Sequence, residues 1–217
     1  VIENNVAYVR IPYLSAGKAA ETRKQLDALI KKNVTGIVLD LRATAGGEEQ
    51  EGVQLANLFL DSGTLGYVQG QKIEKRTFSA NPKEALTKLP VVTLVNQGTA
   101  GAAEIAAGAL LDSKRGALVG TKTFGSGSFQ KLIMMDDGAA LLLSVGKYYT
   151  PSGVEIQANG VKPTVESLQA NEETFNPDDE TEVVQPTKPV ATDDDKQLKK
   201  AIEILRDPSK ANLKPAA

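Results

Sequence analysis

Short, almost entirely apolar runs constrain the fold of this chain more than any other feature. They occupy residues 35–41, 91–95 and 117–119. A strand that is apolar along its whole length is typical of a parallel sheet whose two faces are both covered by helices. Alternation of such strands with helices predicts an α/β fold.

The segments between these runs have helical spacing. Their apolar residues predict helices over 18–32, 50–60 and 102–111. An alternating segment at 6–14 predicts a further strand. After residue 130 the period changes, and the Asp136-Asp137-Gly138 turn between 131–135 and 139–145 predicts an antiparallel hairpin.

The chain of 217 residues, 41% of them hydrophobic, is long enough to bury one sizeable core. We expect an α/β core over 1–169 and an acidic linker or loop over 170–195, where Glu, Asp, Pro and Thr replace large apolar residues. Residues 196–217 are expected to form a helix and tail that pack on the core, with Asp193 to Asp195 capping the helix.

Composition excludes several kinds of chemistry. The chain contains neither His nor Cys, so Ser/His and Cys/His triads, a thiolate nucleophile and the usual zinc sites are excluded. The acidic segment does not have the spacing of a calcium-binding loop, and we predict no metal site and no cofactor. A net charge of −2 without a basic, aromatic-rich cluster argues against nucleic acid as a partner.

Three segments at the ends of predicted strands are candidates for a site. In 96–105 a buried strand passes through a small-residue turn into a helix, whose first N–H groups suit an oxyanion or a carboxylate. Close packing of helix on sheet explains the same small residues. The glycine-rich segment 120–130 lacks P-loop spacing, and a flexible turn is its alternative interpretation. Paired glycines end 40–47, at the edge where α/β sheets place ligands.

Together these segments resemble the carboxyl-terminal processing, or tail-specific, peptidases, a family of Ser/Lys serine peptidases. The family motifs are similar to 40–47, 96–105, 123–130 and 148–153 of this chain. The resemblance implies a ClpP/crotonase-like core, with a mostly parallel sheet flanked by helices and an antiparallel hairpin. It also implies peptide or protein C-terminal tails as partners, and an extracytoplasmic location in the bacterial periplasm or cell envelope.

The chain departs from the family at the residues that carry its chemistry. The resemblance places Gly101 at the nucleophile position and Ser126 at the position of the lysine base. Gln130 matches a residue that positions the lysine in relatives. Gly46, Gly47 and Ala102 match the donors of the oxyanion hole. Because glycine cannot be acylated and a serine hydroxyl is not a base near neutral pH, the dyad is replaced.

Three functions remain open. The first is an inactive peptidase core that binds a peptide or partner, with Ser126 facing Gly101 across a cleft. The second is an active endopeptidase with a shifted dyad, Thr99 or Ser128 paired with Lys122. The third is a structural module of a larger envelope protein. The resemblance implies a PDZ domain upstream of this core, as relatives usually have. Association with a membrane would require a further upstream segment. A second copy of the chain, forming a homodimer, is another expected partner.

Overall fold

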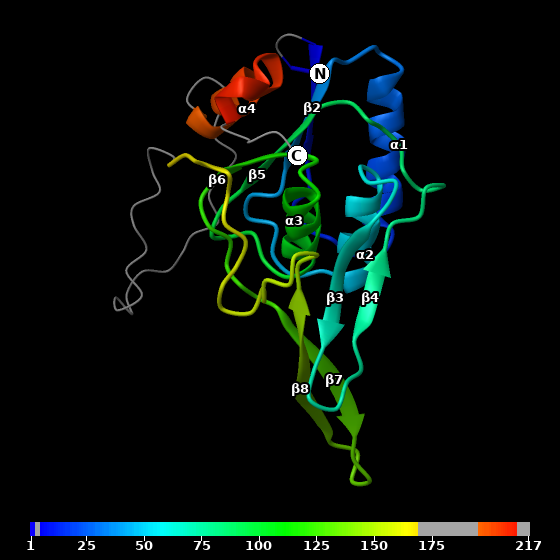
Figure 1. The fold of residues 1–217 in the computed structure, drawn as a ribbon. Coiled ribbons are helices and arrows are strands. Elements are labelled where there is room, and N and C mark those ends of the chain that lie inside the picture. The colour runs from blue at the N-terminus through cyan, green and yellow to red at the C-terminus, as the bar shows by residue number, and fades with distance from the viewer. Residues whose placement is uncertain (3–4, 169–194, 212–217) are drawn as a thin grey trace.

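The computed structural model describes residues 1–2, 5–168 and 195–211. Its elements form two sheets, four helices and a short 3-10 turn within this part of the chain (Figure 1). Apart from Asp195, the acidic segment predicted at 170–195 lies outside the described residues, as do 212–217 of the predicted tail. The domain boundaries therefore stay predictions.

The first sheet is parallel and contains the buried apolar runs. Its strand order is β1-β2-β5-β6-β9, and every neighbouring pair is parallel. The strands are β1 (Val6–Arg10), β2 (Gly36–Asp40), β5 (Val91–Val95), β6 (Gly116–Gly120) and β9 (Val165–Glu166). All residues of β2 and β5 are buried, as continuous apolar runs predict. The predicted α/β fold is confirmed.

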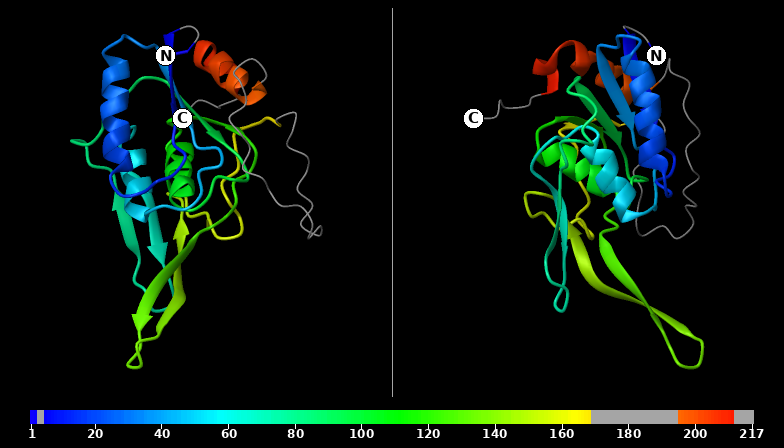
Figure 2. Two further views of the ribbon diagram at one scale, coloured as in Figure 1. Left: turned by 180° about the vertical axis from the view of Figure 1, so that it is seen from behind. Right: turned by 90° about the vertical axis from the view of Figure 1, so that its right-hand side faces the viewer.

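Helices cover both faces of this sheet. Three of them pack on one face, namely α1 (Lys18–Ile30), α2 (Glu49–Asn57) and α3 (Ala102–Asp112), and α4 (Lys196–Arg206) packs on the other (Figures 1 and 2). Alternate strand residues divide between the faces. Ile37 packs in the cluster with α1 to α3, whereas its neighbour Val38 packs with Leu198 and Ile204 of α4.

Helices α2 and α3 touch through their backbones. A Cβ at Gly52 would lie 2.2 Å from the carbonyl oxygen of Ala102, so only glycine allows this approach. The first turn of α3 is thereby held against α2, which fixes the direction in which its free N–H groups point.

A buried ion cluster fastens α4 to the end of β2. The Arg42 guanidinium donates to both carboxylate oxygens of Asp40 and both of Asp195, with Nη2 to oxygen distances of 2.6 and 2.7 Å. Burial by itself lowers the pKa of Arg42, but its hydrogen bonds to the two carboxylates outweigh burial and raise it. Asp195 also caps α4, since its Oδ1 accepts from the N–H of Leu198.

The second sheet is antiparallel, in the order β4-β3-β8-β7. Its strands are β3 (Thr64–Gln69), β4 (Arg76–Ser79), β7 (Ser128–Met134) and β8 (Ala140–Tyr149). The predicted β7–β8 hairpin is confirmed, and it projects from the body of the molecule (Figure 1). The β3–β4 pair was not predicted. None of the helices in the described ranges is long and apolar enough to cross a membrane.

Candidate functional site

Three loops meet at the carboxyl ends of β2, β5 and β6. They are residues 41–47, 96–101 and 121–127, and each forms most of one of the three segments singled out in the sequence. Since β5 lies between β2 and β6 in a parallel sheet, all three loops leave the same edge. This edge is where open α/β sheets bind their ligands.

Asn96 joins the first two loops. Its side-chain oxygen accepts from the N–H of Ala43 at 2.9 Å and from the N–H of Gly98 at 3.0 Å. The N–H of Ala100 donates to the carbonyl of Thr44 at 2.9 Å. These bonds hold the turn before Gly46 against the turn before Gly101, so the two glycine positions become neighbours.

Glu104 joins the second loop to the third, and the sequence analysis did not identify it. Its carboxylate is fully buried and accepts from three backbone amides, those of Gly101, Gly125 and Ser126, and from the hydroxyl of Thr123. Four donors offset the cost of burying the carboxylate, and its position in the first turn of α3 adds a favourable dipole. Glu104 therefore holds the glycine-rich loop on the start of α3.

Gly101 and Ser126 lie close together because of this carboxylate. Their N–H groups donate to the same oxygen, Glu104 Oε2, at 3.0 and 2.7 Å. The two positions are therefore neighbours in the structure, and the cleft expected between them stays a prediction. Ser126 has an exposed side chain, and Gly101 is partly exposed at the N-cap of α3.

The backbone of Gly101 has φ 65° and ψ −120°, a conformation that L-residues adopt only with strain. A Cβ built on Gly101 would lie 3.7 Å from Gly46 Cα and 3.8 Å from Gly46 N, which is ordinary contact. Space for a side chain therefore exists at this position, and that side chain would point towards Gly46.

The three residues predicted to donate to an oxyanion lie on two elements, Gly46 and Gly47 in the loop after β2 and Ala102 at the start of α3. Gly46 and Gly47 are exposed and have positive φ, and a Cβ at Gly47 would meet the carbonyl of Leu14 at 2.5 Å. Ala102 is the first residue of α3, where an N–H has no partner within its helix. Within the described residues, none of these three N–H groups has a hydrogen bond. Their role as an oxyanion hole stays a prediction.

The residues considered for a shifted dyad, Thr99, Ser128 and Lys122, have no hydrogen bond to one another among the described contacts. Thr99 is fully buried, and its hydroxyl donates to the carbonyl of Leu41 at 2.8 Å and accepts from the N–H of Asn96 at 3.0 Å. Ser128 donates to Gln157 Oε1 at 2.9 Å. Lys122 is exposed.

Gln130 lies on β7 with an exposed side chain, whose amide is 3.4 Å from the hydroxyl of Ser144. It contacts the neighbouring strand β8 rather than Ser126 in this structure. Among the described residues, no group of three or more Asp or Glu side chains is arranged to hold a metal ion.

Comparisons with family models and with known sequences point to the same family. The model of peptidase family S41 matches residues 5–167. The chain is 42% identical over 159 residues to the carboxyl-terminal-processing protease of Synechocystis, covering 73% of the chain and 37% of that relative. It is 38% identical over 166 residues to the carboxy-terminal processing protease CtpA of Bacillus subtilis, covering 76% and 35%.

Comparison with solved structures agrees. The photosystem II D1 C-terminal processing protease superposes with a TM-score of 0.71 at 37% identity, over 75% of this chain and 42% of that one. Mature CPAF has a TM-score of 0.63 at 16% identity, over 74% and 46%, and shares the fold alone. The chain spans little more than a third of the length of the two curated relatives.

Proposed function

Because the chain belongs to peptidase family S41, we propose that it is the core of a C-terminal processing peptidase homologue that has lost catalysis and retains a peptide-binding cleft. One observation carries the proposal. The N–H groups of Gly101 and Ser126 share an oxygen of Glu104, so the two dyad positions adjoin, yet position 101 has no nucleophile and position 126 has no base. Loss of both groups typically lowers turnover by about 10⁴ to 10⁶.

The alternative nucleophiles are poorly placed to replace the dyad. Attack by Thr99 would require its buried hydroxyl to leave the carbonyl of Leu41 and the loop to open. The hydroxyl of Ser128 is bonded to Gln157, an amide that cannot take its proton. These contacts support an inactive core over a shifted dyad.

Retained peptide binding is supported by the donors that remain. Gly46 N lies 3.8 Å from a Cβ built at position 101, and Ala102 follows that position at the positive end of α3. A peptide carbonyl or terminal carboxylate would gain roughly 0.3 to 1 kcal/mol from the helix end. Strand pairing and side-chain contacts must supply the rest, and we expect micromolar or weaker affinity.

Incubation of the chain with an unstructured protein tests the loss of activity. We expect no cleavage above a heat-treated control. Time-dependent cleavage that disappears in Lys122→Ala and persists in Lys24→Ala, an exposed lysine of α1, would establish the shifted dyad instead.

Titration with an unstructured peptide, followed by amide NMR shifts, tests binding in the cleft. Shifts at Gly46, Gly47, Ala102 and Ser126 are the expected result. If a saturating peptide leaves these four amides unchanged, the peptide-binding proposal is wrong, and the structural-module hypothesis takes its place.

We also propose that the protein is located outside the cytoplasm and binds the C-terminal tails of peptides or proteins there. The support is its similarity to processing proteases of bacteria and, by their printed names, of chloroplasts. Fractionation of cells that produce the protein would test the location, and recovery in the cytoplasmic fraction would contradict it.

A further inference from the structure

Strand β8 is paired along one edge and only partly along the other. Strand β7 pairs with it from Lys147 to Ala140. On the opposite edge, β3 pairs only with Lys147, Tyr148 and Tyr149. Gln69 and Gly70 lie against Gly146 and Val145, and from Ser144 to Ala140 that edge has no partner strand within the described residues. Figure 2 shows the β3–β4 and β7–β8 hairpins diverging at this level.

Gly70 marks the point where β3 leaves β8. A Cβ on Gly70 would lie 2.0 Å from the carbonyl oxygen of Val145, so the chain passes directly against β8 there. The N–H of Gly70 then donates to the carbonyl of Ile73, which turns the chain back towards β4. Beyond Val145, β3 therefore no longer follows the edge of β8.

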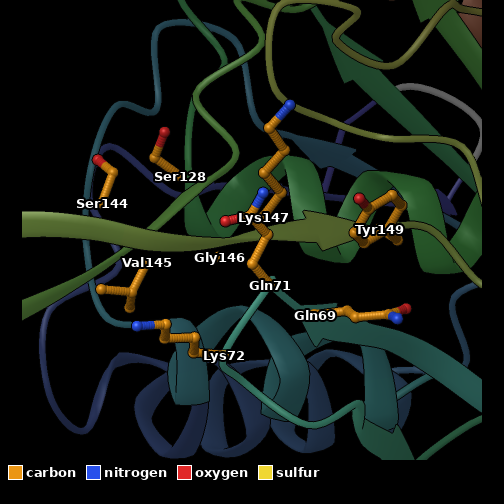
Figure 3. Close-up of a pocket in the computed structure, with 10 residues that line it drawn as sticks. Gln69, Gln71, Lys72, Ser128, Ser144, Val145, Gly146, Lys147 and Tyr149 are labelled. Carbon is orange, nitrogen blue, oxygen red and sulfur yellow. The ribbon is translucent and has the colours of Figure 1, made fainter.

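A pocket of about 730 Å³ opens where the strands part (Figure 3). Its lining includes Lys72 from the turn and Ser128, Ser144 and Val145 from the hairpin. In Figure 3, Val145 and Lys72 lie on one side of β8, and the two serines lie on the other. The exposed ammonium of Lys72 gives this end of the free edge a positive charge.

The projecting hairpin is apolar on both faces. Residues paired across the strands share a face, which places Leu132 with Leu142 on one face and Ile133 with Leu141 on the other. Seven large apolar side chains of the hairpin are at least 44% exposed: Leu132, Ile133, Met134, Met135, Leu141, Leu142 and Leu143. A two-stranded ribbon of this kind is marginally stable in water, and so much exposed apolar surface marks a binding site.

We propose that the free edge of β8, residues 140–144, binds an extended apolar peptide as an added strand, with an acidic residue of that peptide at Lys72. An added strand bonds to the unpaired backbone of β8 and makes the ribbon three-stranded. Its alternating side chains contact the exposed apolar side chains of β8 on both faces, Leu141 and Leu143 on one and Leu142 on the other. This site lies beyond the cleft at Gly101 and does not depend on it.

The test uses a labelled peptide as long as the free edge. It has alternating Val and Ile, one Asp as its terminal residue, and an amidated C-terminus, so that the Asp side chain is its only carboxylate. Fluorescence anisotropy measures its binding to the full chain. Lys72→Glu should weaken binding about tenfold, with the effect reduced by salt, and Lys24→Glu on α1 should not. A peptide with Asn in place of the Asp should also bind about tenfold more weakly.

Strand pairing is tested on the peptide, which leaves the protein unchanged. Two methylated peptides are compared, one with methyl groups on the odd-numbered backbone nitrogens and one with them on the even-numbered nitrogens. Only one of the two sets of N–H groups faces β8, so methylation of that set should abolish binding and methylation of the other should not. In the protein, Leu142→Gln should weaken binding, and circular dichroism should show an unchanged fold. Equal binding of both methylated peptides would overturn the proposal. So would sedimentation showing a dimer that Leu142→Gln dissociates, because a second copy would then occupy the hairpin.

Discussion

The backbone N–H groups of Gly101 and Ser126 donate to one oxygen of Glu104, at 3.0 and 2.7 Å. These residues are 25 positions apart in the sequence and come from different loops. The buried carboxylate acts as a common acceptor, so the relative position of the two loops depends on it. The two backbone amides are therefore held together without any contact from the side chain of Ser126.

Serine at position 101 is expected to destabilise the chain. Gly101→Ser places an L-residue at φ 65°, ψ −120°, and the strain should lower the free energy of unfolding by about 1 to 3 kcal/mol. Urea denaturation measures this change. Ala100→Ser, at the preceding residue, has no positive φ and should stay within about 0.5 kcal/mol of the parent. Equal effects of the two variants would show that the backbone at 101 is not strained.

Restoring both dyad residues should restore some peptidase activity. The Cβ of residue 101 would point towards Gly46, and residue 126 is anchored through the same carboxylate. We expect cleavage of an unstructured protein by Gly101→Ser/Ser126→Lys, and by neither single variant, because nucleophile and base act as a unit. Activity in one of the single variants would mean that a different residue supplies the missing group.

Glu104→Gln should destabilise the loop that follows β6. An amide group cannot accept from all four donors, and its own N–H₂ would face other N–H groups in a buried site. We expect a loss of about 3 kcal/mol in unfolding free energy and faster amide exchange at Gly125 and Ser126. Glu21→Gln, which removes an exposed pair with Lys18, is the control and should cost less than about 1 kcal/mol.

Arg42→Lys should loosen α4. Lysine keeps the charge but cannot donate in parallel to both Asp40 and Asp195, which then remain buried with fewer partners. The expected loss is about 2 kcal/mol in urea denaturation, with earlier proteolytic cleavage near α4. Arg76→Lys alters an exposed bidentate pair with Glu49 and should change stability by less than about 1 kcal/mol.

Stability should fall at alkaline pH. Burial and the neighbouring Asp40 raise the pKa of Tyr8 above its ordinary value of 10.0. Between the two values the unfolded chain has released the phenolic proton and the folded chain has not, so unfolding free energy decreases by up to about 1.4 kcal/mol per pH unit. Tyr8→Phe should flatten this slope above pH 10.0, and Tyr13→Phe, at an exposed tyrosine, should leave it unchanged.

The layered core was predictable because its signals are local. A continuous apolar run such as 91–95 indicates burial on both faces, and the Asp137-Gly138 turn indicates a hairpin. Strands β3 and β4 were missed because β3 contains Gly66 and both are short and partly polar. Their pairing depends on contact with β8, and no pattern within the two segments reports that contact.

Part of the site could also be inferred from the sequence. The motif resemblance predicted that positions 101 and 126 would adjoin. Glu104 was overlooked, although it is the only charged residue between Ala102 and Leu111 in an otherwise small and apolar helix. A charge in that setting signals a buried acceptor.

The sequence by itself determined which chemistry is available: it contains no His or Cys, and it has glycine at 101 and serine at 126. Only the tertiary structure decided that Thr99 is buried, that donors from separate loops converge on Glu104, and that β8 keeps a free edge. The physical reason is that side-chain identity is a local property. Burial, hydrogen bonding and strand pairing depend on groups that lie far apart along the chain and meet only when it folds.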